Sequence, residues 1–438
     1  MKEELYNHML LESNARNYSR HFATTFTKGD GCYLFDNRGK KYIDFLTSAG
    51  VHLLGHSNKR LVSKIKESLD SKLIFSSLDL ITEERIAFIE ELYSFLPERI
   101  IKNKKIHFCS PGGADAIEAA SKLFCIATGR SGIVSFQGSY HGMTSLTLSL
   151  SGESQLKNKL SLSGLGGYVF PYPYLFRNPI GDSDTNPVEA SLRYLEYSFS
   201  ASTSGIPRPS MVVVELVQGE GGCIPAPDDW AIGLQQICKR YDVPLVVDEI
   251  QTGLGRTGRA LACEWAGILP DAITLSKGLG GGFPISVLLH DKKYDIWNQG
   301  DHAGTYRGNQ IAMVAGAETL RILREENILD SVIEKSNYFV GQLLILKEKF
   351  EIIGDVRGRG LMLGLEIVHP HSSEFLGLPQ TNFKAASTIR DYCFKNGLIV
   401  ELGGIDRSTI RFLPPLNVDS SILDDALNIL GQALESIE

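Results

Sequence analysis

The chain has 438 residues, which is enough for two or three domains and a sizeable hydrophobic core. Hydrophobic residues make up 43% of it and charged residues 22%, as in an ordinary soluble globular protein. The formal net charge of −7 argues against a nucleic-acid partner, and no apolar run is long enough for a membrane span. Residues 1–20 lack the apolar core of a secretory signal, so we expect a cytoplasmic location and no membrane association.

The first predicted element is a small antiparallel hairpin over residues 31–45, where apolar and polar residues alternate around an Asp-Asn-Arg-Gly turn. Short apolar strands then alternate with helical patterns. The strands are predicted within 104–110, 132–136, 210–216, 243–250 and 272–275, and the helices within 114–129 and 233–242. Valine- and isoleucine-rich strands separated by helices predict a parallel sheet that is covered on both faces.

Beyond about residue 325 the pattern changes to that of a smaller α+β domain. A long helical stretch is predicted over 316–350, and further strands and helices are predicted within 354–367, 383–396, 397–402, 409–416 and 419–437. We therefore expect three parts. These are an N-terminal segment 1–75 that packs with the small domain, a large domain 76–325 and a small C-terminal domain 326–438.

Lys277 is the first candidate for chemistry. The apolar run Ala272–Leu275 predicts a buried strand that leads almost directly to this lysine and then to a run of glycines. Lysine is rarely buried without a partner, so an ordinary surface lysine is the simplest interpretation. A buried lysine, however, loses its charge readily and then suits Schiff-base chemistry.

Three other features fall at predicted strand ends, where α/β sheets bind their ligands. Asp248 ends an apolar strand, and its buried carboxylate needs a salt bridge, a helix cap or a protonated heterocyclic nitrogen as partner. The Ser-Pro-Gly-Gly turn 110–113 opens a helix whose first N–H groups could bind an anion. Tyr140 and His141 follow the strand 132–136, where an aromatic ring would either stack on a ligand or anchor the loop.

Together these features match the needs of pyridoxal 5'-phosphate. That cofactor requires an imine-forming amine, an acid beside its pyridine nitrogen, a phosphate cup and a stacking ring. The seven cysteines are scattered without paired spacing, and His141 and His302 lack partners at metal-ligand spacing. We therefore expect free thiols and no metal site.

Three motifs, VVDEIQTGLGRTG, PDAITLSKGLGGG and GTYRGN, occur in this order. They resemble those of class III aminotransferases of the pyridoxal-phosphate fold type I, and the resemblance covers nearly the whole chain. It implies a mostly parallel seven-stranded sheet in a large α/β domain, a smaller α+β domain, and a homodimer or larger assembly with shared active sites.

The resemblance also implies residue roles. Lys277 would form the imine with the cofactor and carry a proton, and Asp248 would bind the pyridine nitrogen. Thr305 would reach the phosphate of the neighbouring subunit. The cofactor-binding residues would be Gly113, Ala114, Tyr140, His141, Asp248, Gln251, Lys277 and Thr305.

Substrate recognition would fall to Arg411 and Glu215. The arginine would grip a substrate α-carboxylate, and Glu215 would neutralise it when an ω-amine donor without that carboxylate binds. Several stretches, among them HAGTYRGNQIAMVAG, are most similar to the diaminobutyrate–2-oxoglutarate aminotransferases. This implies 2,4-diaminobutyrate and 2-oxoglutarate, or aspartate semialdehyde and glutamate in reverse, as substrates.

The chain departs from that subgroup at Ala114, which lacks the hydroxyl of the usual threonine, and at Tyr140, where phenylalanine is usual. These departures leave other substrates open, namely another ω-amine, a diamine or a keto sugar of secondary metabolism. An aminomutase or racemase on the same fold and a catalytically silent binding protein are further interpretations. The requirement for a keto acid and the presence of a cofactor absorption band would distinguish them.

Overall fold

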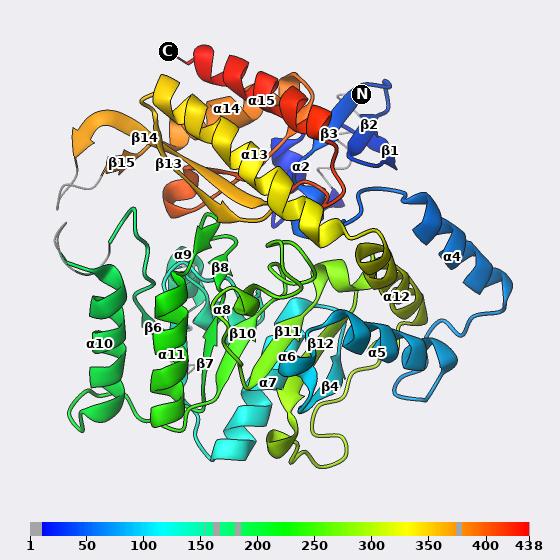
Figure 1. The fold of residues 1–438 in the computed structure, drawn as a ribbon, viewed down its shortest axis with the longest axis vertical. Coiled ribbons are helices and arrows are strands. Elements are labelled where there is room, and N and C mark those ends of the chain that lie inside the picture. The colour runs from blue at the N-terminus through cyan, green and yellow to red at the C-terminus, as the bar shows by residue number, and fades with distance from the viewer. Residues whose placement is uncertain are drawn as a thin grey trace.

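The structure is a computed structural model that describes residues 11–152, 154–160, 167–178, 180, 185–373 and 379–437. Its centre is a seven-stranded sheet in the order β4-β12-β11-β10-β7-β5-β6 (Figure 1). The strands are β4 Lys104–Cys109, β5 Ile133–Phe136, β6 Gly167–Phe170, β7 Met211–Val214, β10 Leu245–Asp248, β11 Ala272–Leu275 and β12 Ser286–Asp291. Only β12 runs antiparallel to its neighbours, so the predicted mostly parallel sheet is confirmed.

Helices cover both faces of this sheet, which explains why strands β5, β7, β10 and β11 are buried along their whole length. Helix α7 packs against β11 and β12, and helix α10 packs beside α11. The helices of this part are α5 Glu83–Phe95, α6 Glu98–Ile101, α7 Gly113–Thr128, α8 Ser145–Leu150, α9 Ser154–Leu160, α10 Pro187–Ser200, α11 Asp228–Arg240 and α12 Gln310–Glu325.

The smaller part contains the sheet β13-β14-β18-β17, with β15 paired to β14. Its strands are β13 Ile353–Arg359, β14 Met362–Ser373, β15 Pro379–Thr381, β17 Glu401–Gly403 and β18 Thr409–Phe412, and its helices are α13 Ile328–Lys349, α14 Phe383–Lys395 and α15 Ser420–Glu435. The chain is thus an α/β fold with a second, smaller α+β part, as predicted.

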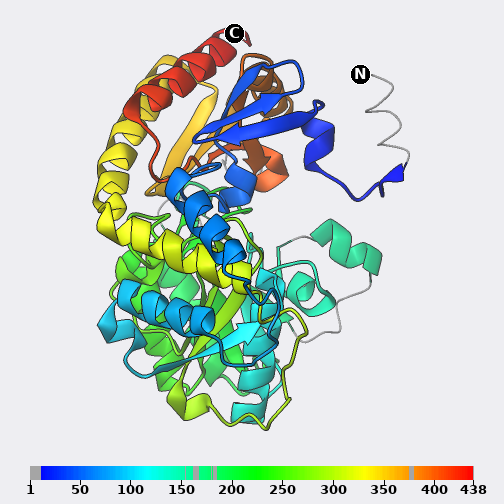
Figure 2. The same cartoon turned by 90° about the vertical axis from the view of Figure 1, so that its right-hand side faces the viewer.

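The N-terminal strands join this C-terminal part rather than the large sheet. Strands β1 Phe26–Asp30, β2 Tyr33–Asp36 and β3 Lys41–Asp44 form an antiparallel meander that includes the predicted hairpin, and β3 pairs in parallel with β16 Leu398–Ile399. Both views place these strands beside the C-terminal helices (Figures 1 and 2). The remaining α-helices and strands are α2 Tyr18–His21, α3 Thr47–Gly50, α4 Lys59–Asp70, β8 Val217–Gln218 and β9 Ile224–Pro225. None of the described helices has the length and hydropathy of a membrane span.

The structure corrects three predicted elements. The helical stretch 316–350 is two helices, α12 and α13, because Asn327 between them adopts a left-handed φ of 49°. The strand predicted over 354–367 is the hairpin β13–β14, which turns at Gly360 with a φ of 57°. The strand predicted over 397–402 is divided between two sheets, as β16 and β17.

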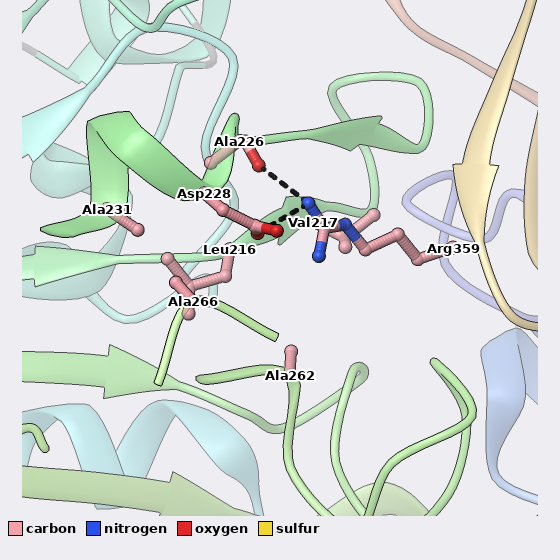
Figure 3. A pocket seen from close by; sticks show the side chains of 8 residues that line it. All are labelled: Leu216, Val217, Ala226, Asp228, Ala231, Ala262, Ala266 and Arg359. Atoms are coloured by element: carbon pink, nitrogen blue, oxygen red, sulfur yellow. Dashed lines mark hydrogen bonds and ion pairs between the residues drawn. The ribbon is translucent and has the colours of Figure 1, made fainter. Parts of the chain in front are cut away.

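Arg359 at the end of β13 fixes the small sheet to helix α11. Its guanidinium donates to the carbonyl of Ala226 at 3.2 Å and pairs with Asp228 at 2.7 Å (Figure 3). The cavity beside it measures only about 10 Å³, which is about the space of one water molecule. This contact is therefore a structural anchor between the two parts and not a ligand site.

Candidate active site

A cavity of about 300 Å³ lies at the ends of the central strands. The segments that follow β4, β5, β7, β10 and β11 contribute to its wall, which is the position where α/β sheets bind ligands. Its lining residues are Gly112, Gly113, Ala114, Tyr140, His141, Gly142, Met143, Glu215, Glu220, Asp248, Ile250, Gln251 and Lys277. Seven of the eight predicted cofactor residues are therefore gathered here, together with Glu215.

Lys277 reaches the cavity wall two residues after β11. Its backbone φ of 44° lies in the left-handed region, which is unusual for a lysine and is typical of residues held in place at functional sites. Burial lowers the pKa of its amine, and the nearby carboxylates of Glu220 and Asp248 only partly oppose this shift. The amine is consequently neutral more often than that of a surface lysine and is a better nucleophile.

Asp248 is buried and joins three segments of the site. One carboxylate oxygen accepts hydrogen bonds from the Thr274 hydroxyl at 3.2 Å and from the Ile250 N–H at 3.1 Å. The other lies 2.8 Å from Nδ1 of His141. A carboxylate has about four acceptor positions, so these contacts leave room for one more donor from the cavity.

His141 is enclosed behind Asp248. Burial opposes its charged form, but the hydrogen bond and the negative charge of Asp248 raise its pKa overall. Its Nε2 atom is buried without a hydrogen-bond partner among the described residues. A positive imidazole on this side of Asp248 compensates the charge of the carboxylate in a dry environment.

Glu215 lines the cavity and is held by two backbone hydrogen bonds. Its two oxygens accept hydrogen bonds from the backbone N–H groups of Tyr140 at 2.8 Å and Gly219 at 3.2 Å. Burial raises its pKa to about 7, His141 partly opposes this shift, and Asp248 reinforces it. Glu215 therefore connects two loops of the cavity wall and carries a proton much of the time near neutral pH.

Arg411 on β18 of the small sheet pairs with Glu220, Nη1 to Oε1 at 2.8 Å, and not with Glu215. Glu220 is not among the predicted site residues, although it stands five residues further along the same ELVQGEGG stretch. Burial disfavours the charged guanidinium, but Glu220 raises the pKa of Arg411 overall. Within the described part of the chain its three side-chain nitrogens have no well-aligned hydrogen bond, so this buried cation has donors available for a ligand carboxylate.

The glycine turn before α7 lies on the cavity wall and is shaped by close packing. A Cβ atom on Gly113 would lie 2.8 Å from the Ile250 side chain, so a larger residue would displace the wall. Ala114 adds a backbone N–H in the first turn of a 16-residue helix but no hydroxyl. The turn can therefore bind an anion through its backbone.

Of the other predicted residues, Tyr140 and Gln251 line the cavity and Thr305 does not. Tyr140 is partly exposed at the cavity, and the Gln251 amide donates to the carbonyl of Ala49 at 2.8 Å, which braces a loop of left-handed residues. Thr305 does not line this cavity and is exposed on the loop between β12 and α12. The structure therefore does not bring Thr305 together with the other site residues of the same chain.

The comparisons with known proteins agree with this geometry. The family model described as "Aminotransferase class-III" matches residues 14–434. The chain is 39% identical to the diaminobutyrate–2-oxoglutarate aminotransferase of Rhizobium meliloti (strain 1021), over 97% of this chain and 91% of that protein. It is 38% identical to the protein of the same name from Haemophilus influenzae, over 97% and 93%.

Solved structures show the same fold at lower identity. A transaminase from the marine bacterium Virgibacillus matches with a TM-score of 0.85 and 22% identity, over 99% of this chain and 98% of that chain. The PMP-bound form of an aminotransferase from Vibrio fluvialis matches with a TM-score of 0.86 and 21% identity, over 97% and 96%. The chain belongs to the class III aminotransferases, so the predicted family and the predicted transaminase activity are confirmed.

The burial of Glu215 predicts a pH-dependent gain of stability in Glu215→Gln. The folded protein binds the carboxyl proton more tightly than the unfolded chain, so the stability due to the neutral carboxyl is complete below about pH 4.5 and is lost as the pH rises to about 7. Glutamine stays neutral, but its amide nitrogen cannot accept one of the two backbone N–H groups, which adds a cost that does not depend on pH. We therefore expect the stability of the cofactor-free variant relative to the wild type to rise by on the order of 1–3 kcal/mol between about pH 5 and 8. Urea unfolding between about pH 5 and 8 measures this, with exposed Glu348→Gln as control. A stability difference that does not change with pH would contradict the assignment.

Proposed function

We propose that the protein uses pyridoxal 5'-phosphate to move an ω-amine between a small diamino acid, best L-2,4-diaminobutyrate, and 2-oxoglutarate. The observation that carries the proposal is a single cavity lined by Lys277, Asp248 and Glu220, the last of which forms an ion pair with the buried Arg411. The names of the Rhizobium and Haemophilus relatives support the choice of substrates.

The residues of the cavity fit this cofactor. When bound, it supplies an aldehyde for imine exchange and a pyridinium ring that withdraws electrons from the substrate carbon. The free acceptor position of Asp248 suits the pyridinium N–H, and the backbone N–H groups at Gly113 and Ala114 suit the phosphate. Tyr140 would cover the ring, Gln251 would lie near its phenolic oxygen, and His141 would hold Asp248 from behind.

Lys277 would have two roles. Its neutral amine would hold the cofactor covalently, and its Nζ, when free, would accept a proton from the substrate carbon or return one to it. The lowered pKa of Lys277 supports both steps, because only the neutral amine is a nucleophile and a base. Its unusual backbone conformation would direct Nζ towards the cavity throughout.

Arg411 and Glu220 would allow one site to accept two substrates of different charge. Glutamate or 2-oxoglutarate would place its α-carboxylate on the guanidinium and displace Glu220, whose side chain is 38% exposed and therefore free to move. An ω-amine donor has no carboxylate next to its reacting carbon, so the Arg411–Glu220 pair would stay closed. In this proposal Glu220 takes the role that the sequence analysis gave to Glu215.

We further propose a cytoplasmic homodimer in which Thr305 reaches the phosphate of the partner subunit. The exposure of Thr305 on a loop outside its own cavity supports this arrangement. A two-subunit site would also explain why the glycine turn before α7 offers backbone N–H donors but no hydroxyl at Ala114.

Lys277→Ala tests the central assignment. The variant should stay folded, lose the visible cofactor absorption band and lose turnover by about 10²–10⁴-fold or more, since no other described lysine lines the cavity. Absorbance, circular dichroism and steady-state rates measure these effects, and Lys239→Ala on the last turn of α11 is the control. Turnover at the wild-type rate would refute the role of Lys277.

Substitutions of Arg411 and Glu220 should impair different substrates. Arg411→Ala should raise the KM for glutamate and 2-oxoglutarate by about 10–100-fold, and that for the ω-amine donor far less, because it removes a charged hydrogen bond to the α-carboxylate. Glu220→Gln should chiefly impair the ω-amine donor, which then meets an unneutralised guanidinium. Equal effects of Arg411→Ala on both substrates would mean that Arg411 does not bind the carboxylate.

The substrate is best identified one donor at a time. The purified cofactor-loaded protein is mixed with a single amine without keto acid, and the loss of its visible absorption band is followed. We expect 2,4-diaminobutyrate and glutamate to cause this loss, and ornithine, lysine and 4-aminobutyrate to fail. If glutamate acts and diaminobutyrate does not, the transaminase machinery stands, but the glutamate amine goes to another semialdehyde or to a keto sugar.

A further inference from the structure

A second cluster of reactive side chains lies outside the cavity. His107, Cys109 and His302 each place one metal-ligating atom so that all three atoms lie within 4.8 Å of one another. His107 and Cys109 stand two residues apart on β4, so they project from the same face of the strand. His302 comes from the loop between β12 and α12, so only the folded chain brings the three together.

Two ring nitrogens in this cluster are buried without a partner. His302 is 8% exposed, and its Nε2 faces Asp115 at 3.2 Å, while its Nδ1 has no hydrogen-bond partner in the described structure. Nε2 of His107 is likewise buried and has no hydrogen-bond partner in the described structure. Leaving a buried polar atom unsatisfied is destabilising, so these two nitrogens beside a thiol are available to bind a ligand.

We propose that His107, Cys109 and His302 bind a zinc ion, with water as the fourth ligand. Two imidazole nitrogens and one thiolate are ligands that Zn²⁺ prefers, and three protein ligands plus water complete a tetrahedron. Tetrahedral zinc sets its ligand atoms roughly 3.3–3.8 Å apart, so the side chains would close inwards by about 1 Å. The Cys109 thiol gives up its proton to solvent as the zinc–sulfur bond forms.

The surroundings support a metal. The contact of Asp115 with Nε2 of His302 leaves Nδ1 as the atom for the metal, which is the carboxylate–histidine–metal arrangement of known zinc sites. Trp297 stacks on the His107 ring with centroids 5.4 Å apart and holds its plane. The nearby cation Arg307 is paired with Asp79, which reduces its repulsion of the ion.

The ion would connect the end of β4, the first turn of α7 and the loop that carries His302. Ser110 follows Cys109 directly, and its Oγ lies so near that loop that a Cβ on Gly304 would be 2.1 Å away. The zinc site would thus hold the segment next to the glycine turn at 112–113. It does not depend on the proposed substrate, so its test is independent of that proposal.

Zinc binding is measured on the complete, untagged, cofactor-loaded protein after removal of metals by dialysis against a chelator. Equilibrium dialysis with zinc chloride should give about one tight equivalent per chain, and zinc should raise the unfolding temperature. Cobalt(II), which zinc sites accept, should show intense tetrahedral d–d bands in the red, where the cofactor does not absorb. Wild-type protein without a tight equivalent or these bands would overturn the proposal.

Variants assign the ion to this cluster. Cys109→Ser and His302→Gln should weaken zinc binding by about 100-fold or more. Asp115→Asn should weaken it by about 10-fold, because Asp115 would not bind the ion but positions His302 and the Ser110 N–H. Cys238→Ser, another buried thiol, and exposed His369→Gln should bind zinc as the wild type does. Zinc binding that Cys109→Ser and His302→Gln both retain would overturn the proposal. Circular dichroism confirms folding, and Asp115→Asn keeps the test valid if a ligand variant does not fold.

Discussion

The buried carboxylate of Asp248 is the interaction on which the rest of the site depends. Removing a charge from water is costly unless hydrogen bonds replace the lost hydration, and each bond to Asp248 comes from a different segment. Thr274 belongs to β11, Ile250 to the loop after β10, and His141 to the loop after β5. Satisfying one charge therefore fixes three strand ends relative to each other and leaves a single acceptor position directed at the cavity.

The two glutamates of ELVQGEGG illustrate how burial divides similar groups between different tasks. Glu215 is enclosed, accepts two backbone hydrogen bonds and has a pKa raised to about 7 by its burial. Glu220 is partly exposed and forms a single ion pair with Arg411. An enclosed carboxyl held by two loops cannot move to release an arginine, whereas a partly exposed one can. Position in the fold, rather than residue type, therefore suits Glu215 to bracing the cavity wall and Glu220 to the switching role that we propose for it.

The sequence was sufficient for features that depend on local pattern. Apolar runs located β10 and β11, and the end of each run identified Asp248 and Lys277 as residues at the sheet edge. The family motifs located the small sheet's Arg411. In contrast, no local pattern determines which carboxylate meets Arg411, because the two sequence segments lie far apart and the turn between Glu215 and Glu220 decides which of them faces it. The same reason hid the cluster of His107 with His302, and a single left-handed residue, Asn327, hid the break between α12 and α13.

The placement of Arg411 has a consequence for catalysis that follows from the fold. Lys277 and Asp248 lie at strand ends of the large sheet, whereas Arg411 belongs to β18 of the small one. A substrate that reached Lys277 and also placed its carboxylate on Arg411 would therefore connect the two parts. Arg359 already holds the same small sheet to α11 through Asp228 and the carbonyl of Ala226. In the proposed mechanism, adaptation to substrates of different charge falls to the Arg411–Glu220 pair, because one partner is enclosed and the other is partly exposed.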